Sequence, residues 1–278
     1  MIAEWDTNHL FLSDRLEGVA PQLVAGLRSA LDGAAIEVIP ETSDIWCRDY
    51  MPVQLSENSF CQFTYRPDYL KGFEHLITLP DRCRLPFMEK YHVEPIVLDG
   101  GNIVVSGTKV ILTEKVYAEN PTVERPRLRS RLEELFQADC IVIPKEPFDP
   151  IGHADGMVRF VAENRVLMND YSTLDPVFGA KLRVLLERSG LQVETLPMFE
   201  EKESRRGDIP SAVGLYTNYL RVGNVVVLPE YDRPEDQAAL QKVQQVMPDT
   251  KVFQVPCRRL AEQGGVLNCI SWTIKRGV

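Results

Sequence analysis

Three segments of this sequence carry the side chains best suited to covalent chemistry. Cys269 follows the glycine pair Gly264-Gly265, His153 and Asp155 share the run Gly-His-Ala-Asp, and Asp49 lies in Trp-Cys-Arg-Asp. A cysteine attacks carbon as its thiolate, a histidine carries protons, and paired carboxylates bind a cation through charge-assisted hydrogen bonds. Together these residue types are the parts of a cysteine-dependent hydrolase.

Each segment alone also has an ordinary structural interpretation. A cysteine within Leu-Asn-Cys-Ile is more often a buried core thiol. Gly-His-Ala-Asp is more often a turn around a hydrogen-bonded histidine, and Arg48-Asp49 is more often an ion pair. His9, His75 and His92 lie in no motif and keep the structural interpretation. The catalytic interpretation therefore depends on where the segments stand in the fold.

A repeated pattern gives the segments equivalent positions. Short β-branched runs, a Gly or Asn turn and an amphipathic stretch predict strand, turn, strand, helix and strand. Three such units start near 102, 156 and 216, with helices over 124–136, 176–189 and 234–246. Asp175 is the predicted N-cap of the middle helix, with proline after it. A fourth unit combines 44–55, 60–65 and 95–98, and a fifth starts at 267–274 and ends with the N-terminal helix 20–31 and strand 35–40.

Polar residues mark the start of each unit. Asp49, Asn102, Asp155, Asn218 and Cys269 lie about 50 to 60 residues apart, as in repeat architectures. We expect a closed ring in which these five side chains converge on the axis. The ring would be a single catalytic domain over 1–278, with the last repeat closed by the N-terminus. The alternative is an ordinary α/β chain with accidental spacing.

The motifs at these positions resemble a known family. Trp46-x-Arg48-Asp49-x-x-Pro52, Gly152-His153-x-Asp155-x-x-x-Arg159-Phe160, and Gly264-Gly265 before Asn268-Cys269 are similar to the agmatine deiminase and Porphyromonas-type peptidylarginine deiminase family. The similarity runs from about Trp46 to Ser271. It implies the pentein fold, a five-bladed α/β-propeller of ββαβ repeats, and hydrolysis of a guanidinium group to a ureido product and ammonia.

The resemblance also implies a role for each motif residue. Asp49 and Asp155 would bind the guanidinium, and Cys269 would attack its carbon. His153 would protonate the departing ammonia and then activate water, oriented by Asp99. Trp46 and Asn218 would line the substrate side, whereas Arg48, Arg159 and Phe160 would support the structure. The bound cation would itself favour the thiolate of Cys269.

Four departures from the family pattern bear on the substrate. Met51 and Val266 stand where glycine is usual, Asn268 stands where histidine is usual, and Asp99 replaces glutamate. The segment between Tyr65 and Pro95 is also short. The departures leave the cysteine, histidine and aspartates in place, but we expect them to alter the pocket.

Agmatine, converted to N-carbamoylputrescine, is the leading substrate hypothesis. The alternative is the arginine of a free amino acid or a peptide C-terminus, giving citrulline. A carboxylate on that substrate would need a cation, for which Arg66 and the pair Arg205-Arg206 are candidates. An amidinotransferase and a non-catalytic propeller that acts as a binding protein are further alternatives.

Composition narrows the class of partner. The formal net charge of −9 argues against nucleic-acid binding and mildly favours a cationic ligand. The N-terminus has no signal-peptide pattern, and no run is long enough to span a membrane. The six cysteines lack C-x-x-C spacing, so we expect reduced thiols in the cytoplasm, no structural metal and no cofactor. A homo-oligomer is left open.

Overall fold

The computed structural model describes residues 1–201, 205, 206 and 209–277. Within them lie five three-stranded sheets, each made of an antiparallel pair and a third strand that runs parallel to its neighbour. The sheets are β3 (Val53–Ser56), β4 (Ser59–Thr64) and β5 (Lys90–Val97); β6 (Val104–Val105), β7 (Lys109–Thr113) and β8 (Asp139–Ile143); β9 (Val158–Ala162), β10 (Arg165–Asn169) and β11 (Gln192–Leu196); β14 (Leu220–Val222), β15 (Val225–Glu230) and β16 (Lys251–Pro256); and β17 (Ser271–Ile274), β1 (His9–Ser13) and β2 (Ala35–Ile39).

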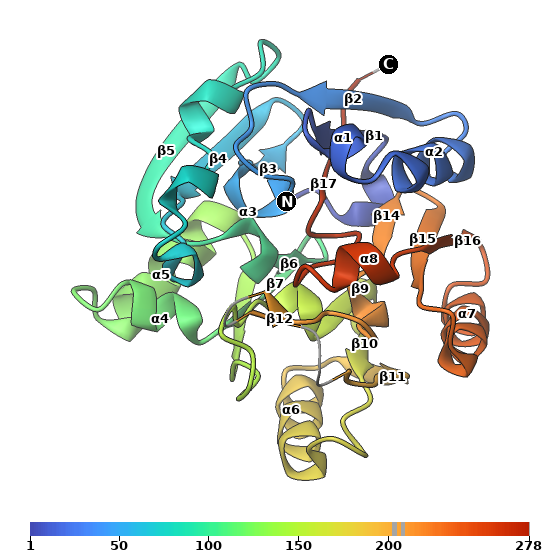
Figure 1. Cartoon of the computed structure of the whole chain (residues 1–278). Coiled ribbons are helices and arrows are strands. Elements are labelled where there is room, and N and C mark those ends of the chain that lie inside the picture. The colour runs from blue at the N-terminus through green and yellow to red at the C-terminus, as the bar shows by residue number, and fades with distance from the viewer. Residues whose placement is uncertain (202–204, 207–208, 278) are drawn as a thin grey trace.

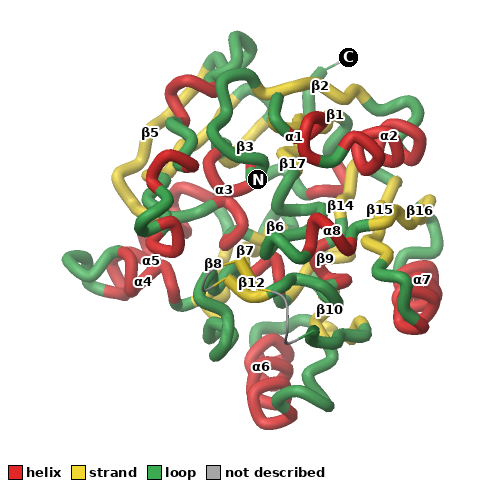
Figure 2. Tube along the Cα trace, viewed as in Figure 1, coloured by secondary structure: helices red, strands yellow, loops and turns green. Residues whose placement is uncertain are grey.

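A helix links the second and third strands in four of the five units. These helices are α2 (Pro21–Ala30), α5 (Arg125–Phe136), α6 (Pro176–Arg188) and α7 (Pro234–Val246). Asp175 caps α6 as predicted, because its Oδ1 accepts a hydrogen bond from the Phe178 amide at 2.9 Å. Helices α2, α6 and α7 lie at the outer rim of the molecule (Figure 2).

The remaining elements are short. They comprise α1 (Leu16–Val19), α3 (Cys47–Tyr50), α4 (Lys115–Glu119), α8 (Arg258–Ala261), the 3-10 turn η1 (Glu4–Asp6) and the strand pair β12 (Arg205–Arg206) and β13 (Ile209–Pro210). In the first unit, three 3-10 turns replace the long helix: η2 (Asp68–Leu70), η3 (Glu74–Leu76) and η4 (Pro80–Cys83). We call residues 65–89, which include these turns, the covering segment. No helix of the described chain has the length and apolar character needed to cross a membrane.

The five units follow one another around a common centre, which confirms the predicted α/β ring (Figure 1). A short turn precedes the first strand of each unit: α3, η5 (Gly100–Asn102), η6 (Ala154–Gly156), η7 (Tyr216–Asn218) and the turn at 267–270. Neighbouring turns are hydrogen-bonded in a closed circle, through Gly101 N to Asp49 Oδ1 at 2.9 Å, Ala154 N to Asn102 Oδ1 at 3.3 Å, Thr217 Oγ1 to Gly156 O at 3.1 Å, Asn268 N to Asn218 O at 3.1 Å and Arg48 N to Cys269 O at 3.1 Å.

Two elements differ clearly from the sequence prediction, and the strand predicted over 95–98 begins earlier, at Lys90. The fifth sheet contains β1, a strand that the sequence analysis did not include, and β1 pairs antiparallel with β17. The predicted strand over 44–55 is mostly turn and helix, and only Val53–Ser56 is strand. There Asp44 Oδ1 accepts a hydrogen bond from the Trp46 amide at 3.0 Å, which turns the chain ahead of α3.

Candidate active site

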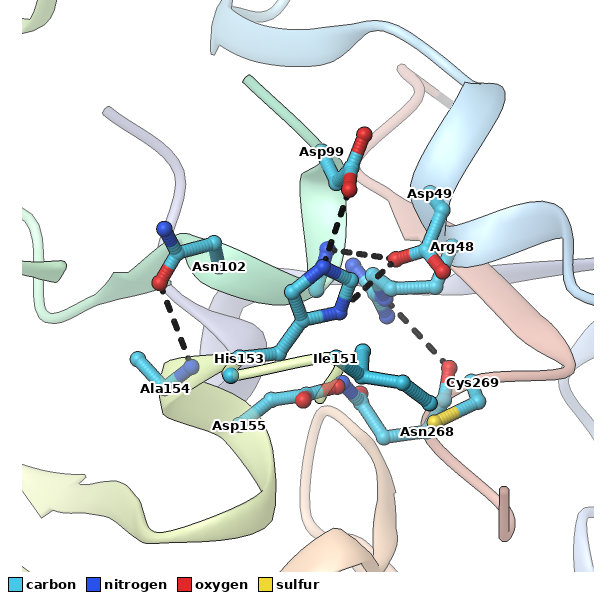
Figure 3. A network of polar contacts seen from close by, with 12 residues as sticks. Arg48, Asp49, Asp99, Asn102, Ile151, His153, Ala154, Asp155, Asn268 and Cys269 are labelled. Atoms are coloured by element: carbon cyan, nitrogen blue, oxygen red, sulfur yellow. Dashed lines mark hydrogen bonds and ion pairs between the residues drawn. The ribbon is translucent and has the colours of Figure 1, made fainter. Parts of the chain in front are cut away.

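A cavity of about 60 Å³ opens where the inner turns meet. Motif residues form one side of it, and the covering segment supplies Tyr65, Tyr69, Leu70, Phe73 and Leu76. The other lining residues are Asp44, Trp46, Asp49, Ile151, His153, Ile209, Gln263, Gly264, Gly265 and Cys269. Figure 3 shows the polar side chains that surround His153. The site therefore combines residues from segments far apart in the sequence.

Asp49 is held from two sides. Its Oδ1 accepts the Gly101 amide at 2.9 Å, and its Oδ2 accepts the Tyr69 hydroxyl at 3.1 Å. Burial raises the pKa of Asp49; protonated His153 opposes this effect, and the carboxylates of Asp99 and Asp155 add to it. A cationic ligand would relieve the same repulsion, so Asp49 is suited to bind one.

His153 lies between two carboxylates (Figure 3). Its Nε2 is 3.0 Å from Asp99 Oδ2, and its Nδ1 is 3.5 Å from Asp49 Oδ1. Burial alone would lower the pKa of His153, but the two carboxylates outweigh it and raise the pKa to about 9. At neutral pH the ring is protonated and able to donate a proton.

Cys269 is the one cysteine that is not fully buried, and all six cysteines are unpaired. Its Sγ is 3.4 Å from Asn218 Oδ1, which also accepts the Asn268 amide at 3.1 Å. Burial, followed by the carboxylates of Asp155 and Asp49, raises the pKa of the Cys269 thiol well above its ordinary value. A positive charge placed beside these carboxylates would oppose the shift and favour the thiolate.

Asp155 is buried beside Cys269 and is oriented by Asn268. The side-chain amide of Asn268 donates to Asp155 Oδ2 at 2.6 Å. Asn268 is one of the departures from the family pattern, and it directly contacts Asp155, a residue that is expected to bind the substrate. Met51 in the first motif and Val266 near the cysteine are two further departures from the family pattern. Both are buried among apolar side chains and do not line the cavity.

Two glycines permit the close packing around the site. A Cβ atom at Gly101 would lie 2.6 Å from both Asp49 Oδ1 and His153 Nδ1. A Cβ atom at Gly265 would lie 2.6 Å from Cζ3 of Trp46, whose ring forms a wall of the cavity. Side chains at these positions would displace the groups that the site needs in place.

The structure does not gather every predicted site residue at the cavity. Trp46, Asp49, His153 and Cys269 line it. Asp99 contacts His153, Asn218 contacts Cys269, and Asp155 is hydrogen-bonded to Asn268, the residue before Cys269. Arg66 is exposed and lines a separate groove with Asp68 and Lys115, so it is not placed to bind a substrate carboxylate in the cavity. The side chains of Arg205 and Arg206 lie outside the described part of the structure.

Sequence reasoning missed three groups near the histidine. Tyr69 bonds to Asp49, and its ring meets that of His153 edge-on at 5.8 Å between centroids. Lys115 lies 3.6 Å from Asp99 Oδ2 and also contacts Glu119. Tyr69 lies in an irregular segment, and Lys115 with Glu119 lies on a short helix after β7. No motif or periodicity marks them, because their role follows from contacts between distant segments.

Comparison with known proteins agrees with this architecture. The family model of Porphyromonas-type peptidyl-arginine deiminases matches residues 2–274. An agmatine deiminase of Pseudomonas aeruginosa (strain UCBPP-PA14) is 27 % identical over 289 aligned positions, which cover 88 % of this chain and 78 % of the relative. The solved structure of Campylobacter jejuni agmatine deiminase has a TM-score of 0.82 at 19 % identity and covers 100 % of this chain and 96 % of that one.

Other relatives are longer than the matched region. A provisionally assigned agmatine deiminase of Latilactobacillus sakei is 27 % identical over 228 positions, which cover 70 % of this chain. The match spans 62 % of that relative's length, and a match from Streptococcus mutans spans 59 %. The chain thus covers less than two thirds of these two relatives.

Proposed function

Because the chain belongs to the Porphyromonas-type peptidyl-arginine deiminase family, we propose that it hydrolyses the guanidinium group of a small cationic substrate, with agmatine as the leading candidate. The observation that carries the proposal is the presence of Cys269, His153 and Asp49 at one cavity, with Asp155 beside the thiol. The name of the P. aeruginosa relative supports agmatine as the substrate.

The charge of the cavity favours a substrate without a carboxylate. Two aspartates, Asp44 and Asp49, line it, and no lysine or arginine does among the lining residues that the structure describes. Trp46, Tyr65 and Tyr69 add aromatic faces that attract a cation. This lining suits a guanidinium with an amine at its other end better than free or C-terminal arginine.

The first half of the proposed reaction begins with Asp49 and Asp155, which bind the guanidinium N–H groups. The positive charge of the substrate lowers the pKa of the Cys269 thiol, which then loses its proton to solvent and adds to the guanidinium carbon. Protonated His153 gives its proton to the leaving nitrogen, the C–N bond breaks, and ammonia departs. A cationic thiouronium on Cys269 remains.

The second half reuses the same histidine. Neutral His153 takes a proton from a water molecule that attacks the covalently bound carbon. As the C–S bond breaks, the hydroxyl proton of the tetrahedral intermediate passes to the departing sulfur, which releases the neutral ureido product and restores the Cys269 thiol. Asp99 keeps Nε2 of His153 in a hydrogen bond during both steps. We further propose that the enzyme works in the reducing cytoplasm, which the six unpaired thiols support.

The deciding experiment is a comparison of kcat/KM for agmatine, free arginine and a peptide with C-terminal arginine, with ammonia release as the assay. We expect a preference for agmatine of about tenfold or more. Arg66→Ala should leave that preference unchanged, because Arg66 is not at the cavity. A preference of similar size for either carboxylate-bearing substrate would overturn the agmatine assignment, and wild-type-like turnover by Cys269→Ala would overturn the mechanism.

A further inference from the structure

Lys115 is a buried lysine that the proposed reaction does not use. Its side chain is 5 % exposed, and its Nζ lies 3.6 Å from Asp99 Oδ2. The same oxygen lies 3.0 Å from Nε2 of His153. Lys115 also contacts Glu119 on its own helix and lies 3.2 Å from Asp68 Oδ1 on the covering segment. The ammonium of Lys115 therefore contacts three acids: Asp99, which is the partner of His153, and also Glu119 and Asp68.

Asp99 lies in buried surroundings, where the positive charge of Lys115 has a large effect. Asp99 is 1 % exposed, and its Oδ1 has no hydrogen-bond partner among the described residues. A buried carboxylate needs positive charge nearby to remain ionised. In the proposed reaction His153 alternates between charged and neutral, so it compensates Asp99 only part of the time. Lys115 stays protonated throughout, since the nearby acids raise its pKa to about 12 against the effect of burial.

The same lysine connects the covering segment to the site. Asp68 directly precedes Tyr69, which donates its hydroxyl to Asp49. The Lys115 ammonium also lies 5.5 Å from the centroid of the Tyr69 ring. Through these contacts, one side chain fixes both Asp99 and the η2 turn that forms part of the cavity wall.

We propose that Lys115 is a positioning residue: it keeps a positive charge beside Asp99, the partner of His153, while the histidine loses and regains its proton, and it fixes the η2 turn at the cavity through Asp68. The inference rests on the proposed function for the cycle of His153. The effect of the charge that Lys115 places beside Asp99 and His153 can be measured through the pKa of His153, without any turnover of substrate.

The sign of the effect follows from the charges that face His153. The groups that face His153 come from several parts of the fold. They are Asp49 of α3, Tyr69 of η2, Lys115 and Glu119 of α4, Asp155 of η6, and three residues outside these elements, Asp99, Asp149 and Cys269. Lys115 repels the protonated ring, whereas Glu119 attracts it. Removing Lys115 should therefore raise the pKa of His153, and removing the charge of Glu119 should lower it.

The test is an NMR titration of isotope-labelled histidine in the full chain, with His153 assigned by its loss in His153→Gln. Lys115→Met should raise the pKa of His153 by about half a unit or more, Glu119→Gln should lower it, and Lys115→Arg should restore it.

With agmatine as substrate, Lys115→Met should reduce kcat by about tenfold or more, and Asp68→Asn should mainly raise KM. The matched control is Lys145→Met, an exposed lysine of the same groove, which should change neither quantity.

Several results would overturn the proposal. One is an unchanged His153 pKa in a folded Lys115→Met protein; another is the same direction of shift in Lys115→Met and Glu119→Gln. If Lys115→Met does not fold, the Glu119→Gln and Lys115→Arg titrations decide. A wild-type protein that deiminates no guanidine, yet shows the expected shifts, would refute the proposed reaction and leave the positioning of Asp99 and His153 by Lys115 intact.

Discussion

Cys269 lies in a setting that is unusual for the proposed nucleophile, because the charged groups that shift the pKa of its thiol are carboxylates. Burial, Asp155 and Asp49 all raise the pKa of its thiol. We therefore predict that a cationic alkylating agent, chloroacetamidine, inactivates the enzyme at pH 7 at least about tenfold faster than neutral chloroacetamide. The amidinium would bind the aspartates and favour the thiolate, as a guanidinium substrate would.

Peptide mass spectrometry should place both labels on Cys269 first, since the other five cysteines are buried. Asp49→Asn should reduce the advantage of the cationic reagent, because the amide no longer attracts the amidinium. Equal rates for the two reagents on the wild-type protein would contradict activation of the thiol by a bound cation.

His153 should set the alkaline limit of activity. The two carboxylates raise its pKa to about 9, so the ring is protonated below that pH and neutral above it. Because departure of ammonia needs the proton, kcat/KM should fall as the pH rises through about 9. On the acid side, kcat/KM should fall as Asp49, whose pKa burial raises, takes up a proton. A profile of kcat/KM against pH that still rises well above pH 9 would argue against His153 as the acid.

The side chains that we propose to contact the reacting group were the part of the site most accessible to sequence reasoning. Cys269, His153 and Asp49 stand in recognisable motifs, and Asp99 precedes a glycine pair. Tyr69 and Lys115 could not be found in that way. Their contacts depend on how an irregular segment and a short helix fold against Asp49 and Asp99, and neither segment has a periodic pattern.

At the scale of elements, the covering segment supplies five of the residues that line the cavity. Its η2 turn places Tyr69 so that the hydroxyl donates to Asp49 at 3.1 Å. A hydrogen bond to a charged group contributes about 1.5–3 kcal/mol, so Tyr69→Phe should lower kcat/KM for agmatine by about tenfold or more. The loss should appear largely as a higher KM if Asp49 mainly binds substrate. Steady-state kinetics of the purified variant measures both parameters.

Tyr91→Phe is the matched control for this change. Tyr91 donates its hydroxyl to Gln62 Oε1 at 3.1 Å and does not line the cavity. Its loss should leave kcat/KM near the wild-type value. If both variants behaved alike, the hydrogen bond from Tyr69 to Asp49 would have no role in catalysis.

Elements were predictable where the local signals were strong. β10 and β15 both follow turn residues, β15 begins with three valines, and α6 has a capping aspartate and a proline. β1 was missed because its five residues show no alternation, with four of them buried in succession. The segment 44–55 was predicted as strand from its apolar residues, but an Asx turn at Asp44 outweighs their strand propensity.

At the scale of the whole molecule, the regular spacing of five polar residues was enough to predict a closed ring. Repetition makes this possible, because equivalent positions in a ring must face the axis. The way in which the first and last strands of the chain close the ring was harder to predict from the sequence. It depends on the pairing of β1 with β17, about 260 residues away along the chain, and no local pattern encodes a partner at that separation.

The N-terminal turn η1, which precedes β1, is anchored to the third unit by an ion pair between Glu4 and Arg159 of β9. The guanidinium of Arg159 is 1 % exposed, lies 2.5 Å from Glu4 and stacks 4.5 Å from the centroid of the Tyr219 ring. Removal of one partner of a buried ion pair leaves an uncompensated charge, so Glu4→Gln should lower the free energy of unfolding by about 2–3 kcal/mol. Chemical denaturation measures the change. Glu17→Gln, an exposed acid on α1, is the control and should have an effect within about 0.5 kcal/mol. Similar stability for the two variants would show that closure of the ring does not depend on Arg159.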